Sequence, residues 1–220
     1  MEDVEDIKVC KVVLLGESGV GKTSIITRYI NDTFEENTMS TTGASYGGKT
    51  LTLNNGKTIK LEIWDTAGQE KYRALAKIFY KDAGIAVLVY DITRRESFEE
   101  IKKYWFNQIK EHGAKGVIIG IAGNKHDLFD REEVKTNEGE NFAKEIDAVF
   151  KVTSASSSDG IEELFRELAN KYYGVDNVSN SSPSPSKSPV NGQSNTEEGY
   201  HKMKLDKNLS KPNNKKKKCC

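Results

Sequence analysis

Residues 16–23, Gly-Glu-Ser-Gly-Val-Gly-Lys-Thr, have the types and spacing of a phosphate-binding loop. They fit the pattern G-x-x-x-x-G-K-[ST] and stand after a short apolar run and before a helical pattern, which is the context that this pattern requires. The glycines let backbone N–H groups face a β-phosphate, Lys22 can reach the β- and γ-oxygens, and the Thr23 hydroxyl can bind Mg²⁺. This segment predicts a nucleoside triphosphate and a magnesium ion as ligands.

A second run, Asp-Thr-Ala-Gly-Gln-Glu at 65–70, carries groups that can couple hydrolysis to movement of a loop. Asp65 follows a strand pattern, and its carboxylate can reach Mg²⁺ through the ion's water shell. Gly68 can turn its N–H toward a γ-phosphate, and Gln69 can orient a water molecule for in-line attack. We therefore predict Gln69 as the catalytic residue.

The run Asn-Lys-His-Asp at 124–127 can select the base. The carboxylate of Asp127 can accept hydrogen bonds from N1–H and the 2-amino group of guanine, whereas adenine offers neither donor. A site built on such paired hydrogen bonds rejects a ligand that lacks them, because its own groups are then left unpaired. The predicted nucleotide is therefore GTP or GDP rather than ATP.

The order of these three motifs, followed by Thr-Ser-Ala at 153–155, resembles the Ras superfamily over essentially all of residues 7–174. The runs at 64–73, 79–83 and 88–93 are similar to the segments that mark Rab proteins within that superfamily. The resemblance implies a switch between GTP and GDP that regulates vesicle traffic. It also implies slow intrinsic hydrolysis, accelerated by a partner that supplies an arginine.

The resemblance also assigns individual residues. Thr41, 19 residues after Lys22, is implied as the first-switch threonine that completes the Mg²⁺ shell, and Phe34 and Lys125 are implied to cover the two faces of the guanine. The implied nucleotide contacts are Ser18, Gly19, Val20, Gly21, Lys22, Thr23, Ser24, Phe34, Glu35, Thr41, Gly68, Asn124, Lys125, Asp127, Ser154 and Ala155. The implied metal residues are Thr23, Thr41 and, through water, Asp65. The aromatic trio Tyr46, Trp64 and Phe79 is implied to present the nucleotide state to effectors.

Some positions depart from the family pattern. Thr42 stands where relatives mostly carry Ile or Val, and Gly47 and Gly48 follow it, so the identity of effectors cannot be carried over. Ser156 replaces the usual Lys of the S-A-K segment, while the Ala155 N–H remains for guanine O6. Ser18 stands where some relatives need Gly to admit an arginine, but Rab proteins commonly tolerate Ser there, so accelerated hydrolysis is still expected.

Alternating strand and helix patterns must position these motifs. Strand patterns occur at 9–15, 46–53, 57–64, 85–90, 117–122 and 149–152, and helical patterns at 22–31, 71–81, 95–111, 132–146 and 160–172. This alternation is typical of a parallel sheet covered by helices, and the hairpin of 46–53 with 57–64 adds an antiparallel edge. We predict an α/β fold, a P-loop NTPase G domain with a six-stranded, mostly parallel sheet, one antiparallel edge strand and helices on both faces. Each motif then falls at the carboxyl end of a strand, where such sheets bind ligands.

Composition divides the chain near Gly174. All four prolines lie beyond it among Ser, Asn and Lys, and residues 175–220 carry nine Lys against four Asp or Glu. Because the formal charge of the whole chain is zero, the tail has a net charge of +5 and the rest −5. We predict a GTPase domain at 1–174 and a disordered tail at 175–220. This distribution argues against nucleic acid as a partner and for an anionic membrane surface near the tail.

The chain ends in four lysines followed by Cys219 and Cys220. A terminal cysteine pair is not a C-a-a-X box, but it resembles the Rab double-cysteine end, where two geranylgeranyl groups would be added. Two lipids beside a basic stretch give stable anchoring, and no apolar run in the sequence is long enough to span a bilayer. The resemblance thus implies the cytoplasmic face of intracellular membranes with cycling through the cytosol, and residues 43–44, Gly-Ala, suggest endosomes.

The partners implied by the resemblance are an exchange factor, a GTPase-activating protein, effectors and a prenyl-binding escort, and the chain is expected to be a monomer. The motifs leave two other functions to compare with this switch. Asp127 and the absence of a lid that binds an acceptor argue against an ATP-dependent kinase or ATPase. A nucleotide-locked binding module that recruits partners without significant hydrolysis is the other alternative, and hydrolysis that depends on Gln69 would separate it from the switch.

Overall fold

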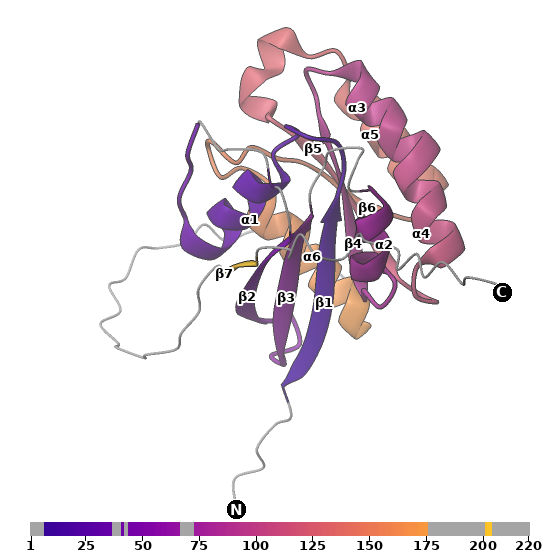
Figure 1. Ribbon diagram of the computed structural model, residues 1–220. Helices are drawn as coiled ribbons and strands as arrows, with labels where there is room; N and C mark the ends of the chain where they lie inside the picture. The colour runs from indigo at the N-terminus through magenta and orange to yellow at the C-terminus, as the bar shows by residue number, and fades with distance from the viewer. Residues whose placement is uncertain (1–6, 37–40, 42–43, 67–72, 176–200, 204–220) are drawn as a thin grey trace, which may run out of the picture.

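The computed structural model describes residues 7–36, 41, 44–66, 73–175 and 201–203 (Figure 1). Its centre is a twisted sheet in the order β6-β5-β4-β1-β3-β2-β7. The strands are β1 (Lys8–Leu15), β2 (Ala44–Thr52), β3 (Thr58–Thr66), β4 (Ile85–Asp91), β5 (Ile118–Asn124), β6 (Val149–Val152) and β7 (His201–Met203).

The pairing confirms the predicted architecture. β1 runs parallel to both β3 and β4, β4 to β5 and β5 to β6, while β2 and β3 form the antiparallel hairpin. Every residue of β4 is buried, as expected for a central strand covered on both faces. The carboxyl ends of β1, β3, β4 and β5 therefore lie along the same edge of the sheet.

A short seventh strand extends the six that the sequence predicts. His201–Met203, from the predicted tail, pair antiparallel with β2 from Tyr46 back to Ala44. An edge strand presents unpaired backbone N–H and C=O groups, which any extended segment nearby can use. The rest of the predicted tail, at 176–200 and 204–220, lies outside the described residues.

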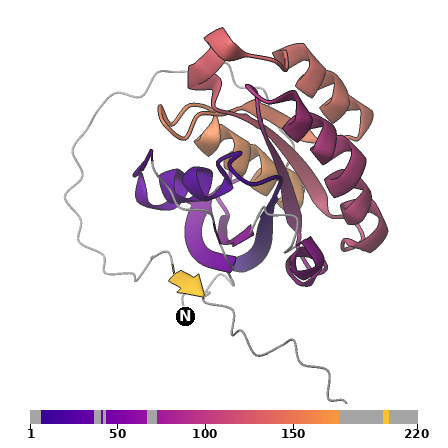
Figure 2. The ribbon, with the colours of Figure 1, turned by 45° about the horizontal axis from the view of Figure 1, so that its top comes forward.

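Helices cover both faces of the sheet (Figures 1 and 2). One face packs on α1 (Lys22–Asn31) and α6 (Ile161–Tyr173). The other packs on α2 (Arg73–Tyr80), α5 (Thr136–Glu145) and the run of α3 (Arg95–Glu100), η2 (Ile101–Trp105) and α4 (Phe106–His112). Alternate residues of β1 enter the two cores, as a strand's two-residue period requires: Cys10, Val12 and Leu14 face α1 and α6, and Val13 and Leu15 face the others.

Two helical stretches differ from the prediction. The pattern at 132–146 becomes helical only at Thr136, because the N–H groups of Glu133 and Val134 donate to the carbonyl of Ile92 instead of starting a helix. The 3₁₀-helix η3 (His126–Arg131) was not predicted. It follows Lys125, whose φ of 66° turns the chain sharply out of β5, and it carries Asp127 to the edge of the site.

Candidate functional site

A cavity of about 440 Å³ lies at the carboxyl ends of the central strands. Its volume is within the range of small-molecule sites. It gathers residues from the phosphate loop, α1, the segment before β2, the end of β3, the β5–η3 turn and the loop after β6. The lining residues are Ser18, Gly19, Gly21, Lys22, Thr23, Ser24, Phe34, Glu35, Glu36, Thr41, Thr66, Asn124, Lys125, Asp127, Leu128, Ala155 and Ser156.

The phosphate loop needs glycine at two positions where it passes close to other parts of the protein. Gly16 has a φ of 149°, and a Cβ there would lie 2.2 Å from the carbonyl oxygen of Val89. Gly21 has a φ of 94°, and its Cβ would lie 2.3 Å from Nδ2 of Asn124. Any larger residue would force the loop away from β4 and from the base-binding side.

Lys22 begins α1 and points into the loop. Its side chain is buried, and its Nζ donates to the carbonyl oxygens of Gly16, at 2.9 Å, and Glu17, at 2.8 Å. Burial lowers the pKa of Lys22 to about 8, against the opposing attraction of Asp65 and Glu17. The ammonium is thus held at the centre of a loop whose backbone N–H groups and helix N-terminus favour an anion.

The three predicted metal residues come together from three separate segments. Thr23 Oγ1 donates to Asp65 Oδ2 at 2.7 Å, Thr41 Oγ1 donates to the same oxygen at 3.1 Å, and the two hydroxyl oxygens lie 2.9 Å apart. Neighbouring ligands of an octahedral Mg²⁺, with bonds of about 2.0–2.1 Å, are separated by roughly 2.9 Å. Oxygen donors at this spacing fit a magnesium ion.

Asn124 joins the base-binding side to the phosphate loop. It is buried, its Nδ2 donates to the carbonyl of Val20 at 2.8 Å, and its Oδ1 accepts from Thr153 Oγ1 at 3.2 Å. Both polar ends of this amide are therefore used inside the protein. It holds two loops together and lines the cavity, and its contact with a nucleotide stays a prediction.

Asp127 lies at the exposed rim of the cavity, where Ser154 Oγ donates to its Oδ1. Ser154 is fully buried and so fixes how the carboxylate is turned. The next residue, Ala155, lines the cavity, and its carbonyl accepts from Arg28 Nε of α1 at 2.8 Å. The loop after β6 is thereby tied to both η3 and α1.

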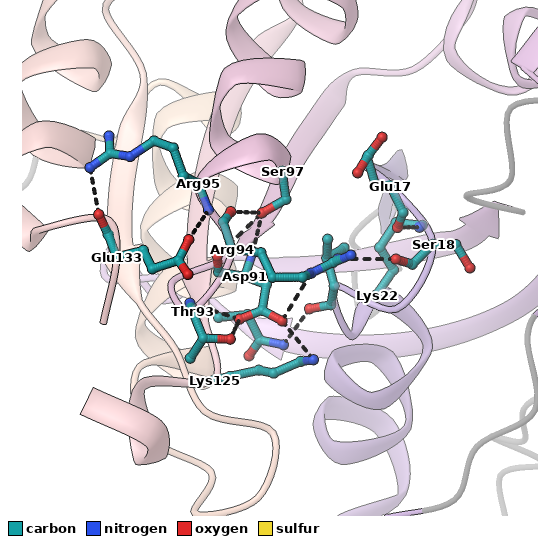
Figure 3. A network of polar contacts seen from close by, with 12 residues as sticks. Glu17, Ser18, Lys22, Asp91, Thr93, Arg94, Arg95, Ser97, Lys125 and Glu133 are labelled. Carbon is teal, nitrogen blue, oxygen red and sulfur yellow. Dashed lines mark hydrogen bonds and ion pairs between the residues drawn. The ribbon is translucent and has the colours of Figure 1, made fainter. Parts of the chain in front are cut away.

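The side chains that are implied to flank the base both line the cavity. Phe34 is half-buried and packs against the core under α1 and α6. Lys125, in the left-handed conformation, extends its Nζ to Asp91 Oδ2 at 2.7 Å (Figure 3). Hydrogen bonds from Lys125 and Thr93 outweigh the effect of burial on Asp91 and hold the pKa of that carboxyl below its ordinary value.

The predicted aromatic trio forms a continuous cluster. The ring centroids of Tyr46 and Trp64 are 5.2 Å apart, and those of Trp64 and Phe79 are 5.5 Å apart. Tyr46 and Trp64 are direct cross-strand partners on β2 and β3, and Phe79 comes from α2. The cluster thus joins the two strands to a helix.

Four cavity-lining residues were not predicted as contacts: Glu36, Thr66, Leu128 and Ser156. Each of the four directly follows a predicted site residue, which is the signal that could have found them. Val20, Asp65 and Ser154 are outside the set of described residues that line the cavity, and they support it from behind through the hydrogen bonds given above.

Gly68, Gln69, Cys219 and Cys220 lie outside the described residues. Within the described part of the chain, the helices are too short or too polar to cross a membrane.

Comparison with known proteins agrees with this geometry. The Ras family matches residues 11–174. The chain is 42% identical to human Ras-related protein Rab-22A over 173 residues, which cover 79% of this chain and 87% of that protein. It is 43% identical to mouse Ras-related protein Rab-31 over 171 residues, which cover 78% of this chain and 85% of that protein. The chain therefore belongs to the Ras family, within which it is a Rab GTPase that binds guanine nucleotide, hydrolyses GTP to GDP and regulates vesicle trafficking.

Proposed function

We propose that the 440 Å³ cavity holds GTP or GDP together with one Mg²⁺, and that Gln69 positions the attacking water. The observation that carries this proposal is the convergence of three chemically different sets on one cavity. The phosphate loop with Lys22, the oxygens of Thr23 and Thr41, and the carboxylate of Asp127 come from widely separated parts of the sequence. A guanine nucleotide with its Mg²⁺ has one part for each set: the phosphates, the metal ion and the base.

Each set has a distinct task in this proposal. The Lys22 ammonium and the loop N–H groups neutralise the β- and γ-phosphates. Thr23 and Thr41 would hold Mg²⁺ directly and Asp65 would hold it through water; when bound, the ion offsets negative charge on the phosphate oxygens. Asp127, oriented by Ser154, accepts the two donors of guanine. Phe34 and Lys125 exclude water from the faces of the base.

In the reaction, water adds to the γ-phosphorus and the bond from that phosphorus to the oxygen it shares with the β-phosphate breaks, giving GDP and phosphate. Gln69 orients the water, and Lys22 stabilises the charge that develops on the leaving oxygen. Thr41 and Gly68 would contact the γ-phosphate only before hydrolysis. Loss of those contacts is how the switch reports its nucleotide to partners.

The same proposal extends to partners and location. The Tyr46, Trp64 and Phe79 cluster is offered as the effector-facing surface, and the chain as a monomer that uses an exchange factor, an activating protein and a prenyl-binding escort. Cys219 and Cys220 would carry two geranylgeranyl groups that hold it on the cytoplasmic face of endosomal membranes between periods in the cytosol. The intact mass of the protein from its own cells tests the anchor: two lipid additions are expected, and unmodified cysteines would contradict it.

Single-turnover hydrolysis of bound GTP in Mg²⁺ tests the catalytic part. The Gln69→Leu variant should lose most of the hydrolysis while still binding GTP, because it keeps the phosphate and base contacts. Gln193→Leu, in the tail, is the matched control and should hydrolyse GTP as the parent does. ATP should not be bound. A rate that does not depend on Gln69, with GTP bound tightly, would favour the nucleotide-locked binding module instead.

A further inference from the structure

Asp91, at the carboxyl end of β4, is the centre of a polar network beside the phosphate loop (Figure 3). The residue is 1% exposed. Its Oδ1 accepts from the Thr93 N–H at 2.9 Å and the Thr93 hydroxyl at 2.7 Å, and its Oδ2 pairs with Lys125 Nζ at 2.7 Å and Arg94 Nε at 3.4 Å. One buried carboxylate therefore holds a residue of the base-binding loop and an arginine that follows β4.

The other end of Arg94 reaches the phosphate loop. Its Nη2 donates to the carbonyl oxygen of Ser18 at 3.1 Å, across 76 residues of sequence. Arg94 nevertheless lies outside the described residues that line the cavity, so it approaches the loop from behind.

The network makes a continuous connection from Ser18 through Arg94 and Asp91 to Lys125. Ser18, in the phosphate loop, and Lys125, in the base-binding run, both line the cavity. A nucleotide held at both ends leaves most easily when the two loops move apart, and this connection opposes that movement. The planar guanidinium of Arg94 suits the position, because its Nε and Nη2 can donate to a carboxylate and to a carbonyl at the same time. A lysine ammonium is a single charged centre and cannot span the two acceptors in this way.

We propose that Arg94 is a positioning residue for nucleotide retention, which clamps the phosphate loop to the base-binding loop through Asp91. This inference rests on the proposed occupation of the cavity by guanine nucleotide. Arg94 touches neither the reacting atoms nor the base. Its removal should therefore speed the release of GDP and GTP alike and leave the hydrolysis step nearly unchanged.

The neighbouring arginine provides a matched control. Arg95 has the same side chain one residue later, but its guanidinium pairs with Glu138 of α5, at 2.7 and 2.8 Å, and with the carbonyl of Glu133. Arg95→Met thus removes a guanidinium of similar exposure, 38% against 40% for Arg94, together with its ion pair, without touching the phosphate loop. Any general effect of losing an arginine from this segment should appear in both variants.

The test is the dissociation rate of fluorescent GDP from full-length protein in Mg²⁺, with excess unlabelled GDP as competitor. Arg94→Met should release GDP about 5- to 10-fold faster, the effect of one charge-assisted hydrogen bond reduced for a side chain 40% exposed. Arg95→Met should stay within about 2-fold of the parent, and Arg94→Lys should fall between parent and Arg94→Met because one contact can be kept.

Single-turnover hydrolysis separates positioning from general damage. The Arg94→Met rate constant should stay within about 2-fold of the parent, since the groups at the γ-phosphate are untouched. Unchanged GDP release in Arg94→Met, or equal acceleration in Arg95→Met, would overturn the inference. If the parent itself bound no guanine nucleotide, the proposed function would fail instead. If the parent releases GDP slowly and hydrolyses GTP normally, but Arg94→Met changes neither rate, the proposed function stands and only the clamp is excluded.

Discussion

The two ends of the cavity are built in different ways. At the base end, Asn124 and Asp127 are held by Val20, Thr153 and Ser154, which are protein groups that a bound nucleotide does not displace. At the metal end, the side-chain oxygens of Thr23, Thr41 and Asp65 bond to one another. A cation that binds there would take a lone pair from each of the two hydroxyl oxygens in place of the contact between Thr23 and Thr41, while both O–H groups can go on donating to Asp65.

This difference assigns selection of the base to the base end and the response to the bound ligand to the metal end. In the proposed complex the base end is preorganised, so little of its interaction energy with guanine is spent on rearranging protein groups. The metal end exchanges partners when its ligand arrives, and one of its members, Thr41, comes from the segment between α1 and β2 rather than from a helix or strand. Groups that change partners with a ligand are those that can report its presence.

Asp127→Asn should break the base end and has the largest expected effect. GTP and GDP should bind about 100-fold more weakly, because two charge-assisted hydrogen bonds to guanine are lost or reversed. Xanthine nucleotides should gain affinity, since an amide can donate to the 2-oxo group and accept from N1–H. Calorimetric titration measures both, and Asp130→Asn, exposed in the same 3₁₀-helix, is the control. Unchanged preference for guanine would contradict the assignment of Asp127.

Thr23→Val tests the metal end with a side chain of the same shape. The Mg²⁺ concentration that half-suppresses nucleotide release should rise about 10-fold, the cost of one ligand-forming hydroxyl. At saturating Mg²⁺ the preference for guanine over adenine should be retained, because the base end is built independently. Thr50→Val, on the exposed part of β2, is the control. An identical Mg²⁺ dependence in parent and Thr23→Val would remove Thr23 from the metal site.

The sequence predicted those parts of the site that depend on local order. The phosphate loop follows β1 directly, Asp65 is the second-last residue of β3, and the base-binding run begins at the last residue of β5, so a correct strand pattern places all three at the same edge of the sheet. The contact of Tyr46 with Trp64 was implied by the family resemblance, and the register of the β2–β3 hairpin accounts for it. Spacing and period carry this information without any knowledge of side-chain packing.

The supporting contacts could not be predicted in this way. Arg28 donates to the carbonyl of Ala155 across 127 residues, and Arg94 to that of Ser18 across 76. A backbone carbonyl has no sequence signature, so such a bond leaves no pattern at its acceptor. The later start of α5 has the same cause, since the carbonyl of Ile92 takes the N–H groups of Glu133 and Val134. Long-range hydrogen bonds to backbone carbonyls therefore fix side-chain contacts and helix starts that the local sequence preference does not determine.

The smallest expected effect is a proton taken up by Lys22. Its pKa is lowered to about 8 from 10.5, so its buried charge weakens the fold below pH 8, and this penalty is relieved as the pH rises from 8 toward 10.5. Phosphate oxygens favour the ammonium, so GDP binding should take up about three quarters of a proton at pH 8.5 and about a tenth at pH 7. Calorimetry in two buffers of different ionisation enthalpy measures this uptake. The phosphates are already ionised at pH 8.5, so an equal uptake at both pH values would mean that Lys22 stays charged throughout and that the phosphate end, like the base end, is preorganised.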